Sequence, residues 1–84
     1  MTRTVTVLYF ASVREFAGTS EARLALSDDV RTIADLSAHL ERIVVGLAGR
    51  LGSVRFAINE TFVSADACIS DGDVVAVIPP VSGG

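Results

Sequence analysis

The stretch that decides the fold runs from residue 32 to residue 47 and reads TIADLSAHLERIVVGL. Its apolar residues recur at intervals of three and four, which predicts an amphipathic helix with one buried stripe. The stripe consists of Ile33, Leu36, Leu40, Ile43, Val44 and Leu47. Thr32 is the expected N-cap, and Asp35 lies in the first helical turn, where an acidic side chain is favoured. The sequence therefore predicts one long helix that packs through a single face.

Segments on both sides of this helix have the patterns of β-strands. They are residues 3–10, 21–27, 54–58, 61–64 and 74–78. Residues 3–10 alternate between two faces, with Val5, Val7 and Tyr9 on one of them. Residues 74–78, VVAVI, are apolar at every position, which is typical of a strand in the centre of a sheet. We expect the first and last strands to lie side by side and parallel.

A short helix is predicted between the first two strands. Ser12 and Glu15 fit a capping box, with Ser12 as the N-cap, and Gly18 is suited to end the helix in a left-handed conformation. Val13, Phe16 and Ala17 are expected on one side of this helix. The order of strand, short helix, strand, long helix and further strands predicts an α+β fold of the β-grasp (ubiquitin-like) type, a mixed sheet crossed by one long helix.

Composition excludes several classes of function. The 84 residues suffice for one domain, expected over residues 1–80. The net charge is −3 and the seven basic residues form no stripe, so nucleic-acid binding is not expected. A single cysteine cannot form an internal disulfide, and no apolar run approaches the ~20 residues of a membrane span. The first residues do not resemble a signal peptide, so a cytoplasmic location is expected.

The usual catalytic and metal-binding sets are missing from the sequence. His39 is the only histidine and is expected on the polar face of the long helix, which excludes a histidine-based metal cluster. Cys68 has no CxxC partner, and we expect a small, partly buried residue there instead of a nucleophile. Asp66, Asp71 and Asp73 lack the spacing of a calcium loop and are expected in turns. We expect no metal and no permanently bound cofactor.

The C-terminal end is more informative. Pro79-Pro80 ends the last strand because proline cannot donate to the ladder, and residues 81–84, VSGG, are expected to form a flexible tail. Fully extended, these four residues would reach roughly 13 Å, and glycine can enter a narrow channel because it lacks a Cβ. The terminal carboxylate of Gly84 could then react after activation as an adenylate. The Gly-Gly pair alone would equally fit an ordinary disordered tail.

A second feature is apolar surface on the side of the sheet away from the long helix. Leu8, Phe10, Ala76 and Ile78 are expected to share that face near the point where the tail departs. Such a patch on a small domain indicates a protein interface. Partial cover by the loops around residues 60–69 is the alternative.

Several stretches together make the chain resemble the small subunits of molybdopterin synthase over nearly its whole length. They are FASVRE at residues 10–15 with Gly18, the segment 59–64, DGD at residues 71–73, and PPVSGG at residues 79–84. This resemblance implies a sulfur carrier of molybdenum cofactor biosynthesis that is not catalytic alone. By the same resemblance, Phe10, Arg14, Phe62 and Ile78 contact the partner, and Val81, Ser82 and Gly83 enter it.

The chemistry that the resemblance implies takes place at Gly84. An ATP-dependent activating enzyme would adenylate this residue, and a sulfur-transfer system would convert it to a thiocarboxylate. The sulfur would then pass to cyclic pyranopterin monophosphate inside the large synthase subunit, in a heterotetramer of two small and two large subunits. Relatives often carry Thr at the position of Ser82 and aromatic residues at the positions of Val77 and Ile78.

Three other functions stay open from the sequence. One is a sulfur carrier of the thiamine type, although such carriers typically lack the segment around residues 12–18. Another is a protein modifier that is attached to lysines of target proteins through Gly84. The third is an interaction module that carries no sulfur.

Overall fold

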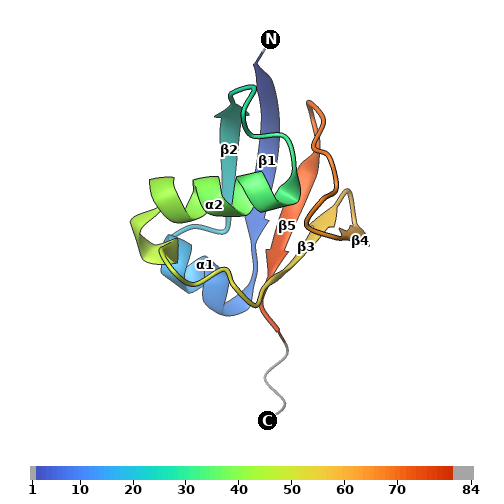
Figure 1. Ribbon diagram of the computed structural model, residues 1–84. Helices are drawn as coiled ribbons and strands as arrows, with labels where there is room; N and C mark the ends of the chain where they lie inside the picture. The colour runs from blue at the N-terminus through green and yellow to red at the C-terminus, as the bar shows by residue number, and fades with distance from the viewer. Residues whose placement is uncertain (1, 81–84) are drawn as a thin grey trace.

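A five-stranded mixed sheet forms the centre of the molecule (Figure 1). The computed structural model describes residues 2–80. Its strands are β1 (Arg3–Tyr9), β2 (Glu21–Leu26), β3 (Arg55–Ile58), β4 (Thr61–Val63) and β5 (Val74–Ile78). Its helices are α1 (Ala11–Ala17), α2 (Ile33–Ile43) and the 3₁₀ helix η1 (Val45–Leu47). Every predicted strand is present, with ends that differ by at most one residue.

The strand order is β2-β1-β5-β3-β4. β1 and β5 are parallel neighbours, and the other neighbouring pairs are antiparallel. The fully apolar strand β5 therefore lies in the middle of the sheet, and the parallel pairing of the first and last strands is confirmed. With α2 crossing one face of this sheet, the chain has the predicted β-grasp fold (Figure 1).

The start of α2 follows the prediction and its end does not. Thr32 Oγ1 accepts a bond from the Asp35 N–H, and the Asp35 carboxylate accepts one from the Thr32 N–H, so the capping box is complete. The helix ends at Ile43 because Val44 adopts an extended conformation, with φ −110° and ψ 106°. The last helical residue, Ile43, is 47% exposed, so its placement on the buried stripe is wrong. Leu47 is nevertheless buried, because η1 turns it back toward the core.

The predicted N-cap of the short helix is also wrong. α1 begins at Ala11, its N-cap is Phe10, and no side chain caps it. The reason lies in the sheet: the Phe10 N–H donates to the carbonyl of Val77 at 3.2 Å, so strand pairing continues to the residue next to the helix. Ser12 is consequently inside the helix and exposed. Gly18 ends α1 with φ 79°, as predicted.

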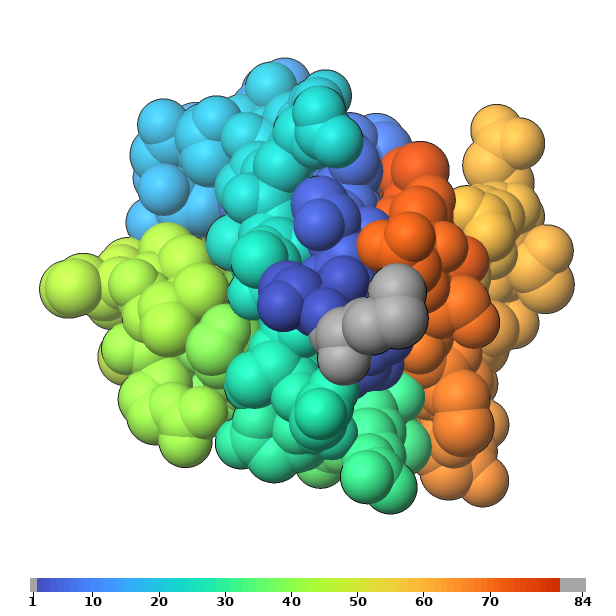
Figure 2. Space-filling model, turned by 90° about the horizontal axis from the view of Figure 1, so that it is seen from above, coloured from blue at the N-terminus to red at the C-terminus, as the bar shows by residue number. Residues whose placement is uncertain are grey.

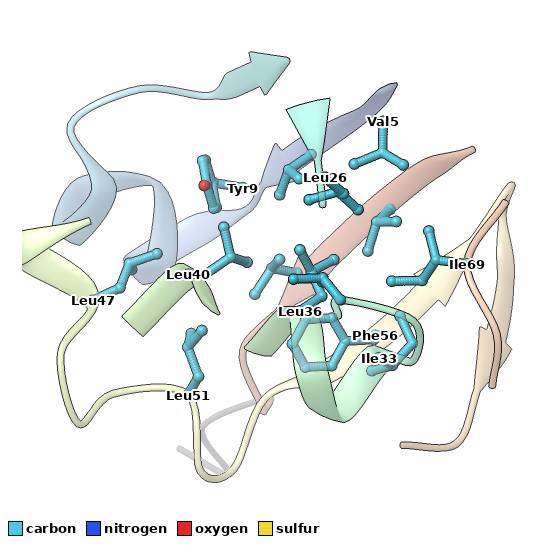
Figure 3. Close-up of a cluster of buried hydrophobic side chains, with 14 of the residues drawn as sticks. Val5, Tyr9, Leu26, Ile33, Leu36, Leu40, Leu47, Leu51, Phe56 and Ile69 are labelled. Atoms are coloured by element: carbon cyan, nitrogen blue, oxygen red, sulfur yellow. The ribbon is translucent and has the colours of Figure 1, made fainter. Parts of the chain in front are cut away.

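The hydrophobic core lies between the sheet and α2 (Figure 3). Leu36 and Leu40 project from α2 onto the residues of β1 and β5 that alternate toward the helix. Within residues 2–80, no polar or charged residue other than Tyr9 falls among the buried ones. The completely buried side chains are Val5, Val7, Leu26, Ile33, Leu36, Leu40, Leu47, Val75 and Val77.

Candidate functional site

The face of the sheet opposite α2 carries a continuous row of apolar side chains. Residues paired in register on neighbouring strands point to the same side of a sheet. Leu8 pairs with Ala76, Ala76 with Ala57, and Ala57 with Phe62, so these four lie in one row across β1, β5, β3 and β4. Their strand neighbours Val7 and Val75 point to α2. The row therefore lies on the other side, which is called the open face below.

Phe10 and Ile78 extend this row toward the end of β5. Phe10 has an extended backbone, φ −115° and ψ 150°, so its side chain follows the same alternation as Leu8. Its N–H bond to Val77 places it beside the last residues of β5. The six residues are called the open-face patch: Leu8, Phe10, Ala57, Phe62, Ala76 and Ile78.

The patch is accessible where its aromatic side chains lie. Phe10 is 45% exposed and Phe62 is 53% exposed. Seen from above, the green residues of α2 lie on one side of the row of strands, which leaves the other side free of that helix (Figure 2). Phe62 belongs to β4, an edge strand of the sheet, so part of the segment 60–69 extends the patch instead of covering it. Exposed aromatic residues around an apolar centre are typical of a protein interface.

The four predicted partner contacts all lie near this patch. Phe10, Phe62 and Ile78 belong to it, and Arg14 is exposed on α1, which follows Phe10 directly. The Arg14 N–H contacts the Phe10 carbonyl at 3.4 Å, which ties the first turn of α1 to the end of β1. The structure thus places Phe10, Ile78 and Arg14 at one end of the open face, and Phe62 on the edge strand β4 of the same face. Whether they contact a partner stays a prediction.

One functional candidate on this face was missed by the sequence analysis. The Arg55 guanidinium carbon lies 4.4 Å from the centre of the Phe62 ring, and Arg55 pairs with Ile78 in the sheet. In the sequence, Arg55 alternates with Val54 and Phe56, a signal that its side chain faces away from the core. Its contact with Phe62 depends on the β3–β4 pairing.

The predicted tail, Val81, Ser82, Gly83 and Gly84, lies outside the described residues. The structure does show where the chain leaves the sheet. β5 ends at Ile78, and the half-buried Pro79 and exposed Pro80 follow at the end of the sheet where Phe10 lies. The open-face patch therefore reaches the last described residues before the Gly-Gly sequence.

The described part of the chain has two other features outside the open-face patch, a groove and a cysteine. A groove of about 530 Å³ runs between α2 and β3, lined by Ala34, Ala38, Leu51, Phe56 and others. Cys68 is exposed, so its expected partial burial is wrong; it lies in an isolated bridge with Thr32 outside the sheet. No group of three potential metal ligands occurs among residues 2–80.

The perturbed titratable groups lie elsewhere. Backbone N–H bonds from Arg31 and Thr32 lower the pKa of Asp35, and a bond from the Ser27 hydroxyl lowers the pKa of Asp29. Burial raises the pKa of Tyr9, whose hydroxyl has no hydrogen-bond partner among the described residues. None of these three groups belongs to the open-face patch. The arrangement of the patch suits protein docking and offers no acid–base chemistry from these groups.

Known proteins share both the fold and the sequence pattern. The chain is 39% identical over 84 residues to the molybdopterin synthase sulfur carrier subunit of Escherichia coli (strain K12), covering 95% of this chain and 99% of that protein. It is 37% identical over 87 residues to small archaeal modifier protein 3 of Haloferax volcanii, covering 90% and 94%. A chain in the solved complex of subunits 1 and 2 of molybdopterin-converting factor from Helicobacter pylori 26695 superposes with a TM-score of 0.69 at 26% identity, covering 96% and 99%.

The family match covers almost the whole chain. The model of the ThiS family matches residues 7–84, which include the end of β1, both α-helices, β5 and the Gly-Gly end. Among the described residues, no helix is long and apolar enough to cross a membrane. The chain belongs to the ThiS family and is a relative of the sulfur carrier subunits of molybdopterin synthase.

Proposed function

We propose that this chain is the sulfur carrier of a molybdopterin synthase and works through the terminal carbonyl group of Gly84. One observation carries the proposal. In a chain that is 39% identical to such a carrier, the apolar open-face patch ends where β5 runs into PPVSGG. A docking face beside the exit of a Gly-Gly segment is what a carrier needs, because the partner must hold the domain and receive its end.

The proposed chemistry starts with an inert carboxylate. An ATP-dependent activating enzyme joins the Gly84 carboxylate to AMP and releases pyrophosphate. A sulfur-transfer system delivers sulfur at the oxidation level of sulfide, and this sulfur attacks the adenylate carbonyl. AMP leaves, and a thiocarboxylate remains. The carrier itself keeps no cofactor, and ATP is bound by the activating enzyme. The sulfur then passes to cyclic pyranopterin monophosphate, so the chain is a sulfur-donating subunit that does not catalyse alone.

The proposed partner is the large synthase subunit. The structural similarity to a complex of subunits 1 and 2 of molybdopterin-converting factor supports this assignment. In the proposal, Phe10, Arg14, Phe62 and Ile78 contact the large subunit. Val81, Ser82 and Gly83 enter its active site, in a heterotetramer of two small and two large subunits. A cytoplasmic location stays an expectation from the sequence.

Reconstitution with the large subunit and the cyclic precursor tests the transfer step. The thiocarboxylate form of the full chain is expected to yield molybdopterin. A variant without Gly84 should yield none and should keep its melting temperature, because the core of the described residues is built from side chains between Val5 and Val77. Loss of thermal stability together with activity would show a structural role and contradict the proposal.

Phe10→Asp tests the docking face separately. The ring is 45% exposed, so a charge there should leave folding intact and should weaken binding of the large subunit. Calorimetric titration measures the affinity, and circular dichroism checks the fold. A folded variant that binds the large subunit as tightly as the wild type would remove the open face from the proposal.

A protein modifier is the second candidate, since small archaeal modifier protein 3 is 37% identical. This function would use the same Gly84 adenylate but would end in an isopeptide bond to a lysine. Mass spectrometry of the producing cells distinguishes the two. Peptides joined to lysine through Gly84 would favour the modifier. A mass increase that corresponds to one oxygen replaced by sulfur at the C-terminus would favour the carrier.

A further inference from the structure

We propose that Arg55 is a specificity residue of the open face and that it binds a carboxylate side chain of the protein partner. The inference rests on the proposed function, because it concerns the same docking surface and the same large-subunit partner. The inference adds a charged contact to the apolar patch. Arg55 is not among the four residues predicted to contact the partner.

The first support is the position of Arg55 in the sheet. It begins β3 and pairs with Ile78, the last residue of β5, so both side chains are on the open face. Ile78 belongs to the apolar patch and directly precedes Pro79-Pro80. Arg55 therefore lies at the edge of the patch nearest to the exit of the C-terminal segment.

The second support is the stack on Phe62. The guanidinium carbon lies 4.4 Å from the ring centre, which is within the range of a cation–π contact. When a guanidinium contacts a ring through its flat face, its N–H groups, which lie in the guanidinium plane, stay free for other bonds. No hydrogen bond from the Arg55 side chain to another residue between 2 and 80 is present. Arg55 is exposed, so its donors are accessible to a ligand.

The chemistry of the ligand follows from these donors. A guanidinium offers five N–H groups in a planar fork that matches the two oxygens of a carboxylate. A partner that covers Phe62 and Ile78 would also exclude water from Arg55, and this strengthens a charged bond. Arginine that is both stacked and buried on binding is a frequent hot spot of protein interfaces. A partner aspartate or glutamate opposite Arg55 is the occupant that this geometry favours.

A second arginine–phenylalanine stack supplies a matched control. The Arg50 guanidinium carbon lies 4.1 Å from the centre of the Phe16 ring. Phe16 belongs to α1 and Arg50 to the loop after η1, so neither is part of the sheet. The two contacts have similar distances, and of the two only that of Arg55 lies on the open face. Arg50→Gln removes the same charge and the same contact without changing the proposed docking surface.

The test titrates the large synthase subunit with Arg55→Gln, Arg55→Lys and Arg50→Gln at several NaCl concentrations. We expect Arg55→Gln to weaken binding by about tenfold or more and to reduce the salt dependence of the affinity. Arg55→Lys should fall in between, because it keeps the charge and loses the planar fork. Arg50→Gln should bind within about twofold of the wild type, as a site outside the interface does. Thermal melts confirm that each variant is folded.

Two results would overturn the inference. Wild-type affinity of Arg55→Gln, with Phe10→Asp defective, would remove Arg55 from the interface and leave the proposed function intact. Weak binding of Arg55→Gln with an unchanged salt dependence would show that only packing on Phe62 matters, and the carboxylate contact would be wrong. Failure of the proposed function is separate: the wild-type chain would then neither bind the large subunit nor support sulfur transfer.

Discussion

The two faces of the same sheet differ in what covers them, although both are apolar. In β5, Val75 and Val77 are completely buried under α2, while Ala76 and Ile78 between and after them are only half-buried on the open face. The strand VVAVI gives no hint of this difference in its composition. An apolar residue on the covered face stabilises the fold, and one on the open face is available for a partner. Mutations on the two faces should therefore separate stability from binding.

The largest effect on stability is expected on the covered face. Leu36→Ala removes a completely buried side chain and should lower the free energy of unfolding by about 2–5 kcal/mol. Phe62→Ala on the open face removes a larger side chain that is 53% exposed, and should cost less than about 1 kcal/mol. Urea denaturation measures both values. Similar losses in the two variants would contradict the division of roles between the faces.

A smaller loss is expected where α1 meets η1. A Cβ on Gly46 would lie 1.8 Å from the carbonyl oxygen of Phe16, so Gly46→Ala must push α1 and η1 apart. Overpacking of this kind costs about 1–3 kcal/mol. Gly52→Ala is the control, because a Cβ at that position meets nothing within 4 Å. If thermal melts show equal stability for both variants, the close packing of α1 on η1 is wrong.

A gain in stability is expected when Tyr9 on the covered face loses its hydroxyl group. Its hydroxyl is buried and has no partner among the described residues, so Tyr9→Phe should stabilise the fold by about 1 kcal/mol. The raised pKa of Tyr9 gives a second readout. This group does not change the stability of the wild-type fold with pH below the ordinary pKa of 10.0. Above it the wild-type fold loses stability, because the unfolded chain ionises before the folded one.

Thermal melts from pH 8 to pH 11 compare wild-type protein and Tyr9→Phe. The variant should melt at a higher temperature throughout, and the difference should widen at the alkaline end. A lower melting temperature for Tyr9→Phe would mean that the hydroxyl has a favourable partner. Phe10 on the open face has no hydroxyl group, so this pH-dependent difference in stability reports on Tyr9 on the covered face.

The smallest effect is expected at the cap of α2, the helix that makes one face covered. The pKa of Asp35 is lowered by bonds from the N–H groups of Arg31 and Thr32. A lowered pKa stabilises the fold above the ordinary value of 3.8, and this contribution is lost as the pH falls through the lowered value. Asp35→Asn should therefore melt slightly lower at neutral pH and should lose less stability on acidification. Parallel melting curves of the two proteins between pH 7 and pH 2 would rule out this role.

Local patterns were read correctly where neighbours in sequence decide the structure. The capping box of Thr32 and Asp35 and the left-handed Gly18 are confirmed. The prediction of Ser12 as N-cap was wrong because the hydrogen bond from Phe10 to Val77 makes Phe10 the N-cap. This bond joins residues that are far apart in the chain. The helical period predicted that Ile43 is buried and that the helix continues to Leu47, but Ile43 is 47% exposed and the backbone becomes extended at Val44.

The candidate site was predictable in part. Alternation along β1 and β5 placed Leu8, Phe10, Ala76 and Ile78 on one face, and the structure confirms this placement. The same alternation could not say that Ala57 and Phe62 would join them, because strand order is a non-local property. The Arg55 stack was missed for that reason. The predicted partial burial of Cys68 was wrong, because the exposure of this residue depends on how the segment 64–70 passes the start of α2.

By itself, the sequence determined the helices and strands, because periodicity and capping act between residues that are close in the chain. The end of β5 before Pro79-Pro80 is local in the same way. Only the tertiary structure decided which side of each strand α2 covers, and so which apolar residues became core and which became the open-face patch. The physical reason is that burial belongs to a pair of surfaces. A side chain is buried or exposed according to what packs on it, and for β5 this is a helix that begins about forty residues earlier in the chain.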